Sequence, residues 1–128
     1  MKELIEVDSK FIYTTVCLHY QPHGYIIIKC NGEDIQTWYR EGRLHRNEDL
    51  PARIWSDGQQ EWFKRGKQHR DGDLPAFISS SGFVKKWYIR GQLHRDGDLP
   101  AIIRDDYIVS PNNSKYEWYI DGIYQGQS

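Results

Sequence analysis

The stretch WFKRGKQHRDGDLPAFI spans residues 62–78, and a closely similar stretch, WYIRGQLHRDGDLPAII, spans residues 87–103. A third copy occupies residues 38–54, and a shortened fourth copy, WYIDGIYQGQS, begins at residue 118. The copies follow one another at spacings of 24, 25 and 31 residues, which indicates a chain built from internal repeats. Each copy opens with a tryptophan: Trp38, Trp62, Trp87 and Trp118.

Turn residues within the copies predict β-hairpins. An X-Gly pair follows each aromatic pair, and glycine accepts the positive φ that a two-residue hairpin loop requires. The short runs between these pairs are rich in aromatic and β-branched residues, and no helical period is visible. The predicted fold is therefore all-β, an antiparallel β-meander of two-stranded repeats in a single twisted or curled sheet with the N-terminal strands capping it. The predicted loops are Asn31-Gly32, Glu41-Gly42, Asp57-Gly58, Arg65-Gly66, Ser81-Gly82, Arg90-Gly91 and Asp121-Gly122.

The chain divides into two parts. Residues 1–37 are predicted to form an N-terminal β cap that contains a degenerate first hairpin and a β-strand over residues 10–20. Residues 38–126 carry the repeats, with units starting at residues 38, 62, 87 and 118. The segment YIVSPNNSKY, residues 107–116, lengthens the third unit and is predicted as an extended hairpin loop.

The hairpin loops also predict which residues face each other. With Arg65-Gly66 as a two-residue loop, Trp62 lies opposite His69 and Phe63 opposite Gln68, so each unit sets its Trp beside its His on one face. The opposite face is the better core candidate, unless a one-residue slip or a bulge exchanges the two faces. That face would collect Tyr39, Leu44, Ala52, Ile54, Ala76, Ile78, Tyr88 and Leu93.

The segment HRDGDLPA is predicted to bend the chain between units. Proline cannot donate a hydrogen bond to a sheet ladder, so the strand must break near Pro75 and Pro100. In the bend, the Arg that follows each His can reach Asp73 or Asp98 of its own unit.

Three repeated histidines, His45, His69 and His94, raise the possibility of a metal site or a general base. Equivalent residues of successive two-stranded units lie roughly 10 Å apart, whereas the ligands of one zinc ion lie within roughly 4 Å of each other. No Ser, Cys or Thr nucleophile recurs beside them. A motif that occurs in three successive units indicates a structural role that every unit shares, so stacking of each His against Trp is favoured. No catalytic residue, metal or cofactor is predicted. His19 and His23 leave a weakly indicated metal site open.

The tryptophan stripe has two interpretations. As core, it would be covered by the N-terminal strands or by a second copy of the chain. As surface, it would form an aromatic patch of the kind that marks interaction sites. The residues that would carry such binding are Trp38, His45, Trp62, His69, Arg70, Trp87, His94, Arg95 and Trp118.

Composition narrows the function classes. The 128 residues carry a formal net charge of −1, with acidic and basic residues interleaved, which argues against nucleic-acid and membrane-surface binding. The start of the chain does not read as a signal peptide and no apolar run could span a bilayer, so a cytoplasmic location is expected. Cys17 and Cys30 form no metal or redox motif, and free thiols are favoured over a single disulfide.

The units resemble the W-Y-x-x-G-x-x-H-R-x-x-x-x-P-A repeats of tailed-phage and giant-virus proteins, which are similar to the MORN repeat. Trp62-Phe63, Gly66 and His69 match the MORN pattern, whereas Arg70 replaces a glycine and DGDL is inserted before Pro75. The resemblance implies an elongated β-meander scaffold that binds proteins and, in some members, lipids. It carries no catalytic residues.

The expected function is a non-enzymatic protein–protein interaction module. The resemblance suggests a virus-encoded adaptor or inhibitor of a host protein in the host cytoplasm, with an unidentified protein partner and homodimerisation left open. The alternative is a small-ligand or nucleotide-binding protein in which rings of the Trp/His/Arg face stack on bases and Arg meets phosphate. An enzyme ranks last.

Overall fold

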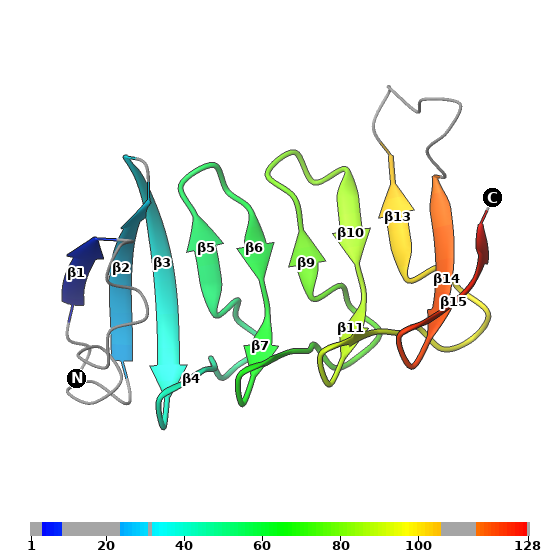
Figure 1. Cartoon of the computed structure of the whole chain (residues 1–128), viewed down its shortest axis with the longest axis horizontal. Coiled ribbons are helices and arrows are strands. Elements are labelled where there is room, and N and C mark those ends of the chain that lie inside the picture. Colours follow the sequence, from blue (N-terminus) through cyan, green and yellow to red (C-terminus); the bar gives the residue numbers. More distant parts are fainter. Residues whose placement is uncertain (1–3, 9–23, 31, 106–114, 128) are drawn as a thin grey trace.

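The fold is all-β, and the computed structural model describes residues 4–8, 24–30, 32–105 and 115–127 (Figure 1). The strands are β1 (Leu4–Asp8), β2 (Gly24–Cys30), β3 (Glu33–Arg40), β4 (Arg43–Leu44), β5 (Arg53–Trp55), β6 (Gln60–Glu61), β7 (Phe63–Lys64), β8 (Lys67–Gln68), β9 (Phe77–Ile78), β10 (Val84–Lys86), β11 (Tyr88–Ile89), β12 (Gln92–Leu93), β13 (Ile102–Arg104), β14 (Tyr116–Ile120) and β15 (Ile123–Gln127).

One long sheet carries the order β1-β2-β3-β5-β6-β9-β10-β13-β14-β15, with β4 paired to β3. The strands of this sheet lie in the order of the sequence, and their pairings are antiparallel from β2 onward, which confirms the predicted meander. The exception is β1, which runs parallel to β2 at the edge of the sheet. The N-terminal strands therefore extend the same sheet beyond the first repeat.

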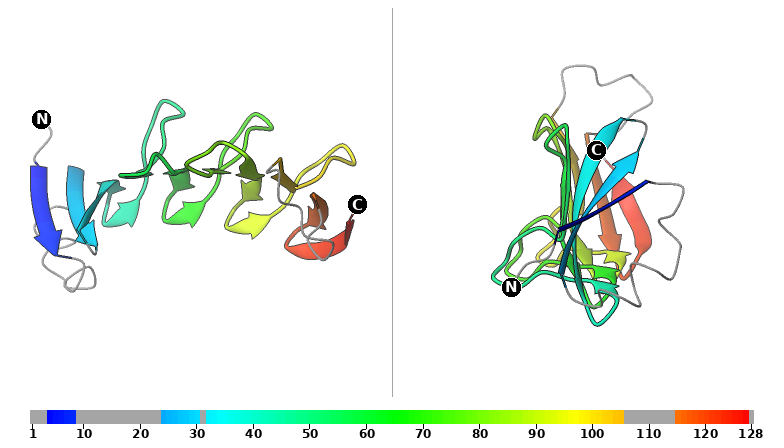
Figure 2. Two further views of the ribbon diagram at one scale, coloured as in Figure 1. Left: turned by 90° about the horizontal axis from the view of Figure 1, so that it is seen from above. Right: turned by 90° about the vertical axis from the view of Figure 1, so that its left-hand side faces the viewer.

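Each unit adds two projections to this sheet. The hairpins β7–β8 and β11–β12 form small separate ladders below it. Seen from above, these hairpins leave one side of the sheet, while the bends over residues 45–51, 69–75 and 94–100 leave the other side (Figure 2). The molecule is thus an elongated sheet with a row of hairpins and a row of bends along it.

The hairpin loops have the predicted two-residue form. In the second unit Arg65 and Gly66 have φ values of 52° and 82°, which is the type I′ geometry that X-Gly favours. Phe63 then pairs with Gln68, and the amide of His69 donates to the carbonyl of Trp62 at 3.1 Å, as the register predicts. The loops at the other end of the sheet are longer than predicted: residues 56–59 connect β5 to β6, and residues 79–83 connect β9 to β10.

The core draws on both faces of the sheet. Two of the predicted core residues, Ala52 and Ala76, have no exposed surface, and neither has Ala101. The other six predicted core residues are only half-buried: Tyr39, Leu44, Ile54, Ile78, Tyr88 and Leu93. Trp62 and Trp87 are also buried, at 6% and 7% exposure, although they were placed on the other face. The prediction of separate faces is wrong for these residues: the amides of Trp62 and Trp87 donate to the carbonyls of Ala76 and Ala101, in register with the pairs Glu61–Phe77 and Lys86–Ile102, so each tryptophan shares a face with the alanine opposite it. Glu61 and Ile102, one position along their strands, are buried on the other face.

Several predictions fall outside the described residues. These are the strand over residues 10–20, the free thiols favoured for Cys17 and Cys30, the weakly indicated metal site at His19 and His23, and most of the loop over residues 107–116. Within the described part of the chain, no helix is long and apolar enough to cross a membrane.

Candidate functional site: the contacts between repeat units

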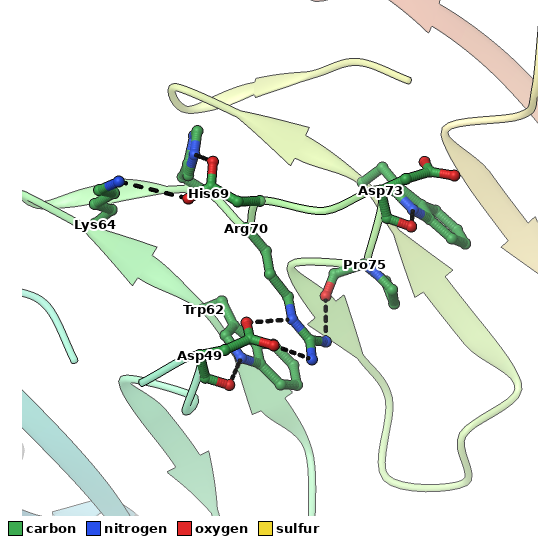
Figure 3. A network of polar contacts seen from close by, with 9 residues as sticks. Asp49, Trp62, Lys64, His69, Arg70, Asp73 and Pro75 are labelled. Atoms are coloured by element: carbon green, nitrogen blue, oxygen red, sulfur yellow. Dashed lines mark hydrogen bonds and ion pairs between the residues drawn. The ribbon is translucent and has the colours of Figure 1, made fainter. Parts of the chain in front are cut away.

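Successive units are joined by a contact that we call the Arg–Trp–Asp clasp (Figure 3). The guanidinium of Arg70 lies over the Trp62 ring, 3.9 Å from the ring centroid, and donates from Nε and Nη2 to the Asp49 carboxylate at 2.9 and 3.1 Å. Trp62 Nε1 donates to the Asp49 carbonyl at 3.1 Å, and Arg70 Nη1 donates to the Pro75 carbonyl at 3.1 Å. Asp49 belongs to the preceding bend, so the clasp joins two units.

The next pair of units repeats the clasp with the same atoms. Arg95 lies 3.9 Å from the Trp87 centroid and donates to the Asp73 carboxylate at 2.9 and 3.4 Å, while Trp87 Nε1 donates to the Asp73 carbonyl at 3.2 Å. The prediction that Arg reaches the Asp of its own bend is therefore wrong. Because each bend is packed beside the next, the nearest carboxylate is the one a unit earlier.

The clasp depends on the shape of the guanidinium. Its flat face covers the indole while its edge presents parallel N–H groups to a carboxylate, and the Arg70 side chain is only 14% exposed. A lysine ammonium has no flat face and cannot donate to two carboxylate oxygens in this fork geometry. The recurrence of Arg after His is thereby explained as a packing requirement.

The histidines form a second contact between units. Nδ1 of His69 accepts a hydrogen bond from the amide of Arg90, in the hairpin loop of the next unit, at 3.0 Å. Its Nε2 donates to Asp71 at 2.8 Å, and this hydrogen bond lowers the pKa of Asp71. A ring nitrogen that accepts an N–H carries no proton, so the neutral ring is fixed as the Nε2–H tautomer.

The other two histidines repeat this contact. His45 Nδ1 accepts from the amide of Arg65 at 3.1 Å, and His94 Nδ1 accepts from that of Asp121 at 3.0 Å. Their Nε2 atoms are bonded to Asn47 and Asp96. Both ring nitrogens of each histidine are thus occupied, which leaves no nitrogen for a metal or for proton abstraction.

The predicted site residues accordingly lie along the contacts between units. Trp62 and Trp87 are buried, so the interpretation of the stripe as core applies to these two. The structure places the other seven in partly exposed positions: Trp38, His45, His69, Arg70, His94, Arg95 and Trp118. The cover over the rings of Trp62 and Trp87 comes from Arg70 and Arg95, rather than from a second layer of N-terminal strands.

The first unit has an incomplete clasp. Arg46 lies 3.7 Å from the Trp38 centroid, and Tyr25 packs on the same indole at 4.7 Å between centroids. Burial lowers the pKa of Arg46, against smaller opposing effects of Tyr25 and Glu48. No repeat bend precedes this unit in the sequence, and the buried Trp38 Nε1 has no hydrogen-bond partner among the residues that the structure describes.

The bends carry a repeated apolar feature that the motif-based predictions omitted. Leu50, Leu74 and Leu99 occupy equivalent positions before the proline of each bend, and each is 40% exposed. We call these three residues the leucine row. The exposure of these leucines could have been predicted from the sequence. Each stands between Asp and Pro in a predicted bend, outside the sheet and therefore outside its core.

An open cavity of about 820 Å³ lies between the first two bends and their hairpins. Six cationic and four carboxylate side chains contribute to its lining. The cationic ones are Arg40, Arg43, Arg46, Lys64, Arg65 and Arg70, and the acidic ones are Glu41, Glu48, Asp49 and Asp71.

Among the described residues, no group of three or more His, Cys, Asp and Glu side chains is arranged to hold a metal ion. Comparisons with protein-family models, with curated proteins and with solved structures give no match.

Proposed function

We propose that the protein is a non-enzymatic protein–protein interaction module that contacts its partner through the leucine row. The observation that carries the proposal is the equal 40% exposure of three large apolar side chains at equivalent points of successive bends. Apolar side chains held at regular intervals on a projecting edge are typical of a binding surface.

The clasps support this proposal because they fix the bends relative to one another. Leu74 lies between Asp73, which accepts from Arg95, and Pro75, whose carbonyl accepts from Arg70. A surface fixed before binding loses little conformational entropy when the partner docks. The partner would be a protein with an elongated apolar strip, either a host protein, if the chain is viral, or a second copy.

Affinity capture from host-cell extract tests the proposal. A triple variant, Leu50→Ser, Leu74→Ser and Leu99→Ser, removes the leucine row. The expected result is at least about a tenfold loss of the captured partner, because burying a leucine contributes about 1.5–3 kcal/mol when complete and each of the three is partly covered already. Equal capture by the triple variant and by the wild type would overturn the proposal.

A matched control removes exposed apolar side chains from other places. The variant Phe83→Ser, Ile123→Ser and Tyr124→Ser changes residues that are 43%, 66% and 47% exposed. It should retain the partner. Light scattering on the wild type and both triple variants separates the two partner classes, because a second copy as partner gives a dimer that the leucine variant loses.

The cavity between the first two bends favours a second candidate, the binding of a small anion or a nucleotide. Six cationic side chains line it against four carboxylates, and with the ion pairs Arg70–Asp49 and Lys64–Asp71 set aside, four cations face two carboxylates. A thermal-shift titration with ATP and with pyrophosphate tests this candidate. Binding raises the melting temperature with ligand concentration, and Arg43→Gln with Arg65→Gln should reduce the shift. An unchanged melting temperature at millimolar ligand would exclude it.

A further inference from the structure

The fourth unit keeps the tryptophan of the clasp but lacks its arginine. In the sequence, Gln125 stands at the position of His69 and His94, and Gly126 at the position of Arg70 and Arg95. In the structure, a register shift between Trp118 and Tyr119 brings Gly126 opposite Trp118, so no side chain from this position covers the indole. Trp118 Nε1 still donates to the carbonyl of Asp98 at 3.1 Å, as the tryptophans of the two complete clasps do with Asp49 and Asp73. The Trp118 indole and the Asp98 backbone therefore make the same contact as in the complete clasps, but no arginine joins them.

The Asp98 carboxylate and the Trp118 ring are both unoccupied by a cation within the described part of the chain. Among the described residues, no hydrogen bond or ion pair engages the Asp98 side chain, whereas the equivalent carboxylates of Asp49 and Asp73 each accept two bonds from a guanidinium. The described residues likewise place no Lys or Arg over Trp118, although the rings of Trp38, Trp62 and Trp87 each carry an arginine.

A cavity of about 440 Å³ lies where the missing arginine would be. Asp98, Trp118, Gln125 and Gly126 contribute to its lining. Gly126 leaves the space open, since a Cβ added there would meet no atom within 4 Å.

We propose that Asp98 and Trp118 form a binding site for an arginine side chain of a partner protein. The two internal clasps supply the template, in which the guanidinium lies flat on the indole and its edge donates to both carboxylate oxygens. Arg95 also lines the cavity, but its guanidinium is engaged by Asp73 and Pro100. Each complete clasp likewise has the arginine of the preceding unit beside it, Arg46 for the Arg70 clasp and Arg70 for the Arg95 clasp.

The site should bind arginine more tightly than lysine, because only a guanidinium can cover the indole and donate to both carboxylate oxygens at once. An ammonium can approach either the ring or the carboxylate, whereas a guanidinium meets both with fixed geometry. The inference rests on the proposed function, because it assigns the arginine to an interaction partner.

Nuclear magnetic resonance titration of the purified full chain tests the site. The probes are the N-acetyl methylamides of arginine, lysine and citrulline, and the readout is the indole Nε1–H signal of Trp118, assigned with Trp118→Phe. The arginine probe should shift this signal saturably with a dissociation constant of about 1–10 mM, as expected for one side chain. The lysine probe should bind at least about fivefold more weakly, and uncharged citrulline should give no saturable shift.

Two variants of the same bend make the test specific. Asp98→Asn should abolish the arginine shift, while Asp96→Asn should change the dissociation constant by less than about twofold. The proposal is overturned by a Trp118 signal that does not move, or by one that moves equally in Asp98→Asn. Because the titration uses no partner protein, it can fail while the leucine row still captures a partner, and it can succeed where capture fails.

Discussion

At the scale of single residues, the repeated motif is a set of groups that each find a partner in the neighbouring unit. Arg70 and Trp62 meet Asp49 of the unit before, and His69 meets the amide of Arg90 in the unit after. His, Arg, Asp and Trp are common in active sites, but here the indole N–H, the guanidinium Nε and Nη2 and the histidine Nδ1 join neighbouring units, while Nη1 of Arg70 and Nε2 of His69 bond within their own bend. The motif recurs because every junction needs the same atoms.

The first prediction at this scale concerns the guanidinium. Arg70→Lys should lower the free energy of unfolding by about 1–2 kcal/mol, because lysine loses the paired hydrogen bonds and the flat contact with Trp62. Urea unfolding followed by tryptophan fluorescence measures the change. The matched control is Arg65→Lys at an exposed hairpin loop, which should change stability by less than about 0.5 kcal/mol. Equal effects of the two substitutions would contradict the clasp.

The second prediction at this scale concerns the histidine rings. His45, His69 and His94 should all be Nε2–H tautomers when neutral, because each Nδ1 accepts a backbone N–H. Long-range proton–nitrogen correlation spectra distinguish the two tautomers. An Nδ1–H tautomer at any of the three would show that the corresponding link between units is not made.

At the scale of elements, the bends are the least regular part of each unit. The second and third bends carry glycine at positive φ, with Gly72 at 79° and Gly97 at 78°, but the first bend has Glu48 at φ 64°. A non-glycine residue costs about 1–2 kcal/mol in this region. The aspartate that follows has positive φ in all three bends, so the strain particular to the first bend is that at Glu48.

Relief of that strain gives a prediction about the bend. Glu48→Gly should stabilise the protein by about 0.5–1 kcal/mol, since the relieved strain exceeds the added entropy of the unfolded chain. Gly72→Ala should destabilise it by a similar amount. Its Cβ would make only an ordinary contact with Leu74 at 3.9 Å, so the cost would come from the backbone. Urea unfolding measures both, and destabilisation by Glu48→Gly would contradict the assignment of strain.

The elements that could be predicted from the sequence are those with a local signal. X-Gly loops fix their own register, so the pairing of Phe63 with Gln68 followed from two turn residues. The parallel pairing of β1 with β2 could not be predicted, because no short turn sequence joins these two strands. The partner of Arg70 could not be predicted either, because Asp49 and Asp73 stand at equivalent places and only the packing of bends distinguishes them. The burial of Trp62 depended on the same packing.

At the scale of the whole molecule, the chain is a one-dimensional array in which each unit contacts its neighbours. The described structure repeats the clasp at two junctions and alters it at both ends, where the first unit lacks a preceding bend and the fourth lacks an arginine. In such an array, stability is approximately the sum of unit and junction contributions. Equivalent units should then be interchangeable.

The central claim is that the repeated residues form the contacts between neighbouring units. Removal of one whole unit is its most direct test. Deletion of residues 62–86 joins Glu61 to Trp87, which brings Asp49 to Arg95 and Trp87, and His45 to the amide of Arg90. The shortened chain should give an all-β circular dichroism spectrum and a cooperative urea transition at lower midpoint, while a deletion of residues 62–78, which breaks the register of the units, should not fold. An unfolded product of the in-register deletion would contradict the account.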